Sequence, residues 1–198
     1  MYKYFIRIII AILIIIFCFA CEDTSIVSQR YKKSKKGRDN ITIAVAGSWD
    51  KINYRVDMLN AVALAVEEIN STNMLNGRKI VLIAKHDSAD INKARLIATE
   101  IANNTDVVAV IGHSLSFITS SVDDIYSIGG LLMLSPSLYI PDKIKKTIPM
   151  MFSYTPNPDS IAETFIRYMK SKNYKSAAVA YLNEDSSIKI LNSFYNIG

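Results

Sequence analysis

The chain has 198 residues, half of them hydrophobic, and a formal net charge of +5. The excess positive charge lies in residues 1–40, and basic and acidic side chains balance from Ile41 onward, so the sequence lacks the basic cluster on a folded domain that nucleic-acid binding requires. Both cysteines, Cys18 and Cys21, precede residue 22, which excludes an internal disulfide, a cysteine zinc site and a thiol nucleophile from the remainder.

Residues 1–21 are predicted to be a secretory signal. Lys3 and Arg7 precede the uncharged apolar run 8–20, the pattern of a basic n-region followed by an apolar h-region. A membrane-spanning helix needs about 20 apolar residues, and this run is shorter. The sequence therefore favours a cleaved or lipid-modified signal over a retained anchor helix, and either of these over a buried core helix.

The end of this run resembles a bacterial lipobox. Ala20, a small residue, directly precedes Cys21, which is followed by polar residues. We therefore predict that Cys21 carries a lipid that anchors the exported protein to the membrane. The alternative is that Cys18 and Cys21 are two apolar cysteines without a role.

Residues 22–40 are predicted to be a basic, flexible linker. The segment carries six basic residues against three acidic ones, and it is most simply a solvated tether. A secondary role would be attraction to anionic lipid, worth about 1 kcal/mol per basic residue close to such a surface. The basic residues are Arg30, Lys32, Lys33, Lys35, Lys36 and Arg38.

Residues 41–152 are predicted to form one α/β lobe. Short apolar runs at 41–46, 79–84, 107–111 and 131–134 predict buried strands, and apolar residues spaced three and four apart predict helices at 59–69, 94–102 and 119–128. Strands without polar alternation are typical of a parallel sheet covered on both faces. The alternation of strand and helix therefore predicts a doubly wound parallel sheet.

The loops that follow these strands hold the candidate binding residues, because ligands bind beyond the carboxyl ends of such strands. Ser114 and Ser116 follow Gly112 at the start of a predicted helix, where hydroxyls and free N–H groups suit a carboxylate. The alternative is that either serine merely caps the helix. Ser137 follows the fourth strand, and Trp49 follows the first and either walls a pocket or packs on the surface.

An ordered series of segments resembles the leucine/isoleucine/valine-binding proteins, which are type I periplasmic binding proteins. The resemblance covers roughly residues 41–182. It implies two α/β lobes that close on a small solute and deliver it to an ABC permease, with no catalytic function and no cofactor. The segments that carry it are 41–47, 63–70, 76–80, 110–113, 124–126 and 132–136.

The resemblance also implies roles for individual residues. Ser116 falls on the serine that bonds the ligand carboxylate, and Ser137 on a position that contacts the ligand through its backbone. Tyr54 falls on an aromatic residue that lines the pocket. Tyr139 falls where the family has a threonine that holds the amino-acid head group, which puts a standard α-amino acid in doubt and favours an amino-acid-like or amide solute.

Residues 153–198 are predicted to begin a second lobe that the sequence leaves incomplete. A crossing strand at 151–155, a helix at 161–169 and a strand at 177–181 are expected. Three functions remain open: a solute-binding lipoprotein of an ABC importer, a ligand-sensing receptor ectodomain of the same fold, and a non-functional truncated remnant.

Catalysis and metal binding are not expected. The two histidines, His86 and His113, lie on different loops, and Asp87 and Asp90 have no further ligands at useful spacing. No phosphate-binding or dinucleotide-binding glycine pattern follows any strand. The chain is therefore predicted to be an exported binding protein and not an enzyme.

Overall fold

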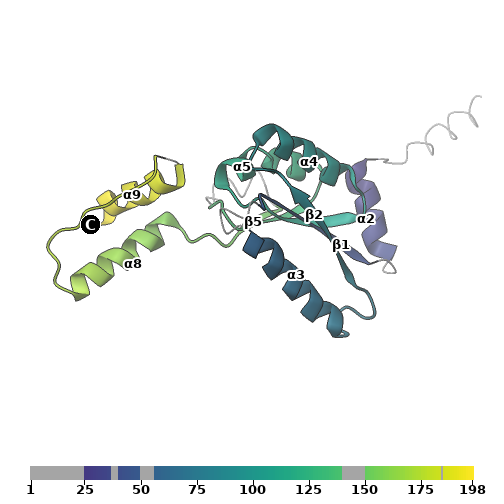
Figure 1. Cartoon of the computed structure of the whole chain (residues 1–198), viewed down its shortest axis with the longest axis horizontal. Helices are drawn as coiled ribbons and strands as arrows, with labels where there is room; N and C mark the ends of the chain where they lie inside the picture. The colour runs from purple at the N-terminus through teal and green to yellow at the C-terminus, as the bar shows by residue number, and fades with distance from the viewer. Residues whose placement is uncertain (1–24, 37–39, 50–55, 140–149, 184) are drawn as a thin grey trace, which may run out of the picture.

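The computed structural model describes residues 25–36, 40–49, 56–139, 150–183 and 185–198 (Figure 1). The predicted signal, Cys21 and Tyr54 lie outside the described residues. The elements, in chain order, are α2 (Ile26–Lys36), β1 (Ile41–Gly47), α3 (Val56–Ser71), β2 (Ile80–His86), α4 (Ile91–Asn103), β3 (Val107–Gly112), α5 (Ser116–Ser120), α6 (Asp123–Ile128), β4 (Leu132–Ser135), β5 (Met151–Ser153), α8 (Pro158–Ser171) and α9 (Asp185–Ile197).

The five strands form one parallel sheet in the order β2-β1-β3-β4-β5. The chain passes from β1 outward to β2 and then returns to the other side of β1, so the strand order reverses between β1 and β3. The crossover from β1 to β2 and the later crossovers move across the sheet in opposite directions. Because crossovers between parallel strands are right-handed, their helices lie on opposite faces of the sheet. The predicted doubly wound parallel α/β fold is confirmed.

One face of the sheet carries the hydrophobic core. A row of apolar residues crosses all five strands in register: Ile83, Ala44, Val110, Met133 and Met151. The helices α4, α5 and α6 cover this row with buried residues such as Ile101, Ile118 and Tyr126. Asp90 caps the first turn of α4 by accepting a hydrogen bond from Lys93 N.

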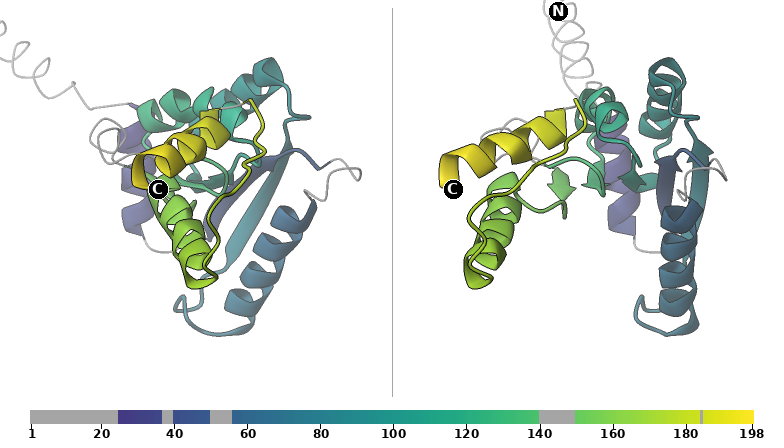
Figure 2. Two further views of the ribbon diagram at one scale, coloured as in Figure 1. Left: turned by 90° about the vertical axis from the view of Figure 1, so that its left-hand side faces the viewer. Right: turned by 60° about the vertical axis from the view of Figure 1, so that its left-hand side comes forward.

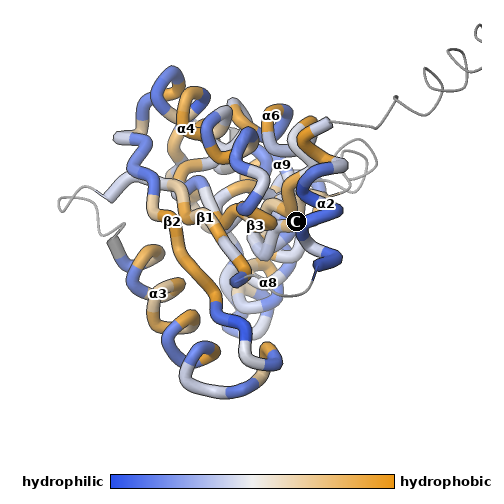
Figure 3. The backbone as a smooth tube through the Cα atoms, turned by 90° about the vertical axis from the view of Figure 1, so that its right-hand side faces the viewer, coloured by the Kyte–Doolittle hydropathy of each residue, from blue (hydrophilic) through white to orange (hydrophobic). Residues whose placement is uncertain are grey.

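The other face is covered by α3, which lies on the opposite side of the sheet from α4 (Figures 1 and 2). In Figure 3 the neighbouring strands β1 and β2 are coloured mainly as hydrophobic. Towards β4 and β5 this face is open, since Leu132 is 40% and Phe152 is 52% exposed. Side chains alternate between faces along a strand, so both residues point away from the core that Met133 and Met151 join.

The predicted tether is wrong for residues 26–36, which form the helix α2 packed against β3. Its Arg30 is 5% exposed and donates hydrogen bonds to four backbone carbonyls, those of Ala102, Asn104, Val107 and Gly129. Three of these carbonyls lie at the ends of α4 and α6, where helix carbonyls lack partners and carry partial negative charge. One arginine therefore attaches this segment to the sheet domain, although its basic composition alone predicts a segment exposed to solvent.

Two further elements differ from the prediction. The expected helix 119–128 is two short helices, because the chain turns at Ser121 and Val122 between α5 and α6. The expected strand 177–181 is absent, since residues 174–183 pair with no strand in the described part of the chain. A lone strand cannot satisfy its backbone polar groups, so these residues stay exposed to solvent.

The last two helices pack against each other beside the sheet domain (Figures 1 and 2). Phe165 and Phe194 contact with ring centroids 5.9 Å apart, and Ser193 Oγ donates to Asp159 Oδ1 at 2.6 Å. Asn157 caps α8 by accepting from Asp159 N. Among the described residues, no helix has the length and hydrophobicity needed to cross a bilayer.

Candidate functional site

The loop after β3 leaves the sheet under tight steric control. Gly112 has φ +147°, and a Cβ there would collide with the carbonyl oxygen of Ala46 on the neighbouring strand. Only glycine tolerates both conditions. The predicted tight exit at Gly112 is therefore present, and it brings Ser114 and Ser116 to the carboxyl ends of β1 and β3.

Neither serine caps the helix that follows. The N-cap of α5 is Leu115, and no side chain makes a cap hydrogen bond there, so the capping alternative is wrong. Ser114 Oγ instead accepts a hydrogen bond from Ser48 N at 3.1 Å, which ties the loops after β1 and β3 together. Ser116 is half-buried and lies at the edge of a cleft.

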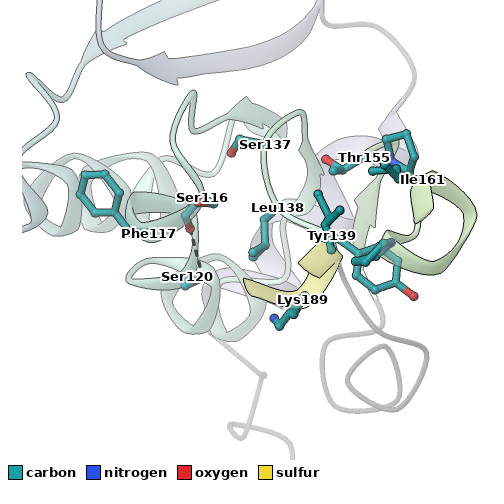
Figure 4. A pocket seen from close by; sticks show the side chains of 12 residues that line it. Ser116, Phe117, Ser120, Ser137, Leu138, Tyr139, Thr155, Ile161 and Lys189 are labelled. Carbon is teal, nitrogen blue, oxygen red and sulfur yellow. Dashed lines mark hydrogen bonds between the residues drawn. The ribbon is translucent and has the colours of Figure 1, made fainter. Parts of the chain in front are cut away.

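The cleft has a volume of about 350 Å³ and lies beyond the carboxyl ends of β3, β4 and β5 (Figure 4). One wall comes from α5 and the loop after β4, and the other from the chain after β5 together with α8 and α9. Its lining is mixed: Ser116, Phe117, Ser120, Ser137, Leu138, Tyr139, Thr155, Pro156, Pro158, Ile161, Lys189 and Ile190. Of these described residues, Lys189 carries the only full charge, so the cleft is weakly cationic.

The structure brings three of the predicted site residues together at this cleft: Ser116, Ser137 and Tyr139. The Ser137 hydroxyl donates to His113 O at 2.8 Å and lies 3.1 Å from Thr119 Oγ1, so protein groups engage it. Ser114 lies at the adjoining loop and not in the lining. Trp49 also lies apart, stacked on His86 with ring centroids 6.4 Å apart.

A buried polar chain supports the loop from below, and the sequence analysis missed it. His113 Nδ1 lies 2.6 Å from Asp87 Oδ2, and His113 Nε2 lies 3.0 Å from the Tyr126 hydroxyl. All three side chains are at most 1% exposed. The carbonyl of His113 accepts from Ser137 Oγ and Thr119 Oγ1, so this residue joins the core to the cleft.

Electrostatics agree with this arrangement. Burial acts to raise the pKa of Asp87, but the hydrogen bonds from His113 and Ala89 N and the charges of His113 and His86 outweigh it, and the pKa lies below its usual 3.8. Burial, with the nearby Asp87 charge, raises the pKa of Tyr126 well above its usual 10.0. Asp87 is thus an ionised acceptor and Tyr126 a protonated donor. The His113 ring lies between them, with Nδ1 facing the carboxylate and Nε2 facing the phenol.

Nothing in the described residues supports a metal centre: no three histidine, cysteine, aspartate or glutamate side chains there are placed to share an ion. The cleft instead combines a concave apolar lining with a few polar groups at a topological switch point, the usual form of a small-molecule site.

Comparison with known proteins identifies the family. The family described as periplasmic binding protein matches residues 51–193. The chain belongs to this family. Its members are solute-binding proteins and not enzymes, which confirms both the predicted resemblance and the prediction that the chain is no enzyme.

Individual relatives are amino-acid-binding proteins by name. The chain is 30% identical over 148 residues to the leucine-, isoleucine-, valine-, threonine- and alanine-binding protein of Pseudomonas aeruginosa, covering 74% of this chain and 39% of the relative. It is 26% identical over 136 residues to the Leu/Ile/Val/Thr-binding protein of Salmonella typhimurium, covering 68% and 37%.

Solved structures give the same picture. An ABC transporter substrate-binding protein from Desulfitobacterium hafniense in complex with Leu has a TM-score of 0.70 and 30% identity, covering 80% of this chain and 47% of that one. A branched-chain amino-acid binding protein from Streptococcus pneumoniae in complex with isoleucine, at 21% identity and a TM-score of 0.65, shares the fold. The chain thus spans less than half the length of these relatives.

Proposed function

We propose that the chain is part of an exported solute-binding lipoprotein of an ABC importer, and that it binds a small amino-acid-like or amide solute. The observation that carries this proposal is the cleft at the carboxyl ends of the strands, where Ser116, Ser137 and Tyr139 meet. The names of the relatives, which bind leucine and similar amino acids, support the solute class.

The cleft suits a carboxylate. Ser116 offers a hydroxyl, and Lys189 supplies a positive charge from the facing wall. A carboxylate accepts hydrogen bonds and is stabilised by a nearby cation. Because the Ser137 hydroxyl is already bonded to His113 O, the backbone of its loop is the part that we propose meets the ligand.

Tyr139 governs the choice of solute in this proposal. Its ring lines the cleft, where the resemblance implies a smaller threonine. A phenol ring occupies more volume and presents its hydroxyl farther from the backbone. We therefore infer that the solute has a smaller or differently placed head group than a standard α-amino acid.

Three features outside the described residues complete the proposal: a signal at residues 1–21, a lipid on Cys21, and Tyr54 as a pocket residue. The importer's permease is the proposed partner, and the outer side of a bacterial inner membrane or cell surface is the proposed location. Mass spectrometry of the protein extracted from membranes tests the lipid; an unmodified Cys21 in the exported protein overturns the anchor.

Calorimetric titration tests solute binding. The protein is titrated with leucine, isoleucine, valine, alanine, threonine and short-chain amides. We expect saturable heat with at least one of them and displacement by its close analogues. Absence of heat with every compound, from a protein that still unfolds cooperatively, contradicts the proposal.

A further inference from the structure

The helix α2 is rigidly attached to the domain. The Arg30 guanidinium spreads its donors over four carbonyls from the end of α4, the start of β3 and the end of α6. Lys33, three residues later on the same face, pairs with Asp106. Gly130 lies directly under the helix, since a Cβ there would be 3.0 Å from both methyl groups of Val27.

The opposite face of α2 is basic and exposed. Residues three and four apart share a helix face, so the inward position of Arg30 and Lys33 leaves Tyr31, Lys32, Lys35 and Lys36 on the outer face, all exposed. Tyr31 is 61% exposed, and Lys35 Nζ lies 5.3 Å from the centre of its ring. Lysines beside an exposed aromatic ring suit a bilayer surface, where tyrosine sits among the headgroups and lysine attracts anionic lipid.

The basic outer face of α2 lies at the opposite end of the domain from the cleft. Arg30 bonds to residues where chains enter strands, at the amino ends of β3 and β4, whereas the cleft lies at the carboxyl ends. Figure 1 shows α2 at one end of the domain and α5, α8 and α9 at the other. A surface that meets α2 therefore leaves the cleft open on the far side.

We propose that the outer face of α2, formed by Tyr31, Lys32, Lys35 and Lys36, lies on the anionic lipid surface of the bilayer and orients the cleft away from it. The inference rests on the proposed membrane attachment, which would place the bilayer within reach. Ser25, the first described residue, is the fourth residue after Cys21, and an extended chain spans at most about 14 Å over these four steps.

Amine labelling in vesicles tests the orientation. The full chain, extracted from the membrane fraction of producing cells, is reconstituted into vesicles of phosphatidylcholine alone or mixed with phosphatidylglycerol. Labelling of each lysine is followed by mass spectrometry at low and high ionic strength. We expect about fivefold slower labelling of Lys32, Lys35 and Lys36 in the anionic vesicles at low salt, in line with the attraction of one basic residue for such a surface.

Two charge-reversal variants sharpen the test. K32E/K35E/K36E removes the basic outer face but keeps Arg30, and we expect it to lose the dependence on phosphatidylglycerol. K170E/K172E/K175E changes charge equally at the exposed end of α8 and serves as the matched control, which should keep that dependence. Circular dichroism of both variants verifies that the helices are retained.

The outcomes separate the inference from the proposed anchor. Flotation of the vesicles on a density gradient shows whether the protein is attached to them. If the protein floats with neither kind of vesicle, the proposed membrane attachment is wrong and the orientation inferred from it is overturned. If it floats with both but the α2 lysines label equally in both, the anchor stands and the docking of α2 is overturned. Equal protection of Lys170, Lys172 and Lys175 would also overturn it, because the whole body would then lie on the surface.

Discussion

The cleft is supported by the buried hydrogen-bonded chain of Asp87, His113 and Tyr126. His113 has its ring in the core and its carbonyl under Ser137, so the ring fixes the loop that carries Ser114 and Ser116. A buried polar chain is stabilising only while every member is satisfied. The protonation state of Asp87 is therefore coupled to the geometry of the site.

Acid should weaken the fold partly through Asp87. Its folded-state pKa lies below the usual 3.8, so the carboxylate contributes stability that is present above that value and is lost as the pH falls through the folded-state pKa. We expect the stability advantage of the wild type over Asp87→Asn to shrink as the pH falls from about 5 to about 2. Urea unfolding across this range measures it. Asp57→Asn, an exposed carboxylate on α3, is the control for loss of one charge, and a gap independent of pH would refute the role of Asp87.

Ser116 should matter more to binding than its neighbour Ser120. Ser120 Oγ already donates to Ser116 O at 3.1 Å, whereas the Ser116 hydroxyl is the one that we propose meets the ligand. Removing one hydrogen bond to a charged group costs about 1.5–3 kcal/mol, so Ser116→Ala should weaken binding at least roughly tenfold. Ser120→Ala is the matched control. Calorimetric titration of both variants compares them, and equal losses would show that Ser116 has no special role.

At the scale of elements, α2 shows how one residue fixes a helix. Arginine keeps its charge when buried and has five donors in a rigid fork, so it can serve several carbonyls at once. Those carbonyls come from the ends of two helices and one strand. A lysine in the same place has three donors at a single point and cannot span them.

Arg30→Met should therefore destabilise the protein by roughly 3 kcal/mol, because buried carbonyls lose a charged donor. Arg30→Lys should recover only part of this loss, and Lys36→Met, at an exposed position on the outer face, should cost little. Urea unfolding gives the free energies, and hydrogen exchange should show that residues 26–36 lose protection in Arg30→Met. Retained protection there would mean that α2 is held by other contacts.

The elements that the sequence predicted well share one property. The strands β1 to β4 are short apolar runs, with the central strands β1 and β3 the more deeply buried, and such runs leave a direct pattern in the sequence. The helix α2 leaves none, because it buries one arginine whose partners lie 72 to 99 residues away. Pattern analysis assigns such a segment to solvent.

The candidate site divides in the same way. Ser116 and Ser137 were predicted because the carboxyl ends of parallel strands gather in one place, and Tyr139 was predicted from the resemblance; all three line the same cleft. The pairing of Asp87 with His113 was missed, because the two residues follow different strands, β2 and β3, which are not neighbours in the sheet. A useful signal was available. The strand β1 lies between β2 and β3 and ends in the small residues Ala46 and Gly47. Polar residues that directly follow the two flanking strands can therefore meet across its end.

At the scale of the whole molecule, the face of the sheet that α3 covers is open at β4 and β5. Leu132 and Phe152 are large, exposed and on the same side, next to the partly buried Leu134. Exposed apolar surface on a sheet favours association with other surfaces. The described part of the chain should therefore tend to self-associate.

Leu132→Thr together with Phe152→Thr should reduce this association while changing the unfolding free energy by less than about 1 kcal/mol, since both side chains are exposed and threonine suits a strand. Sedimentation velocity measures the association. Leu96→Gln, which removes a 73% exposed leucine from α4, is the control and should have no such effect. If the control reduces association equally, general surface hydrophobicity is the cause.

Strand β3 joins the two ends of the molecule. Its first residue, Val107, accepts a hydrogen bond from Arg30, and its last, Gly112, leads into the loop of the cleft. The strand is paired on both sides, with β1 and with β4, and its six residues span about 20 Å. It therefore holds α2 and the loop of the cleft at a fixed separation. A fluorescent donor on α2 would keep a constant separation from the floor of the cleft, so any change in energy transfer to an acceptor on α9 would report the movement of the facing wall alone.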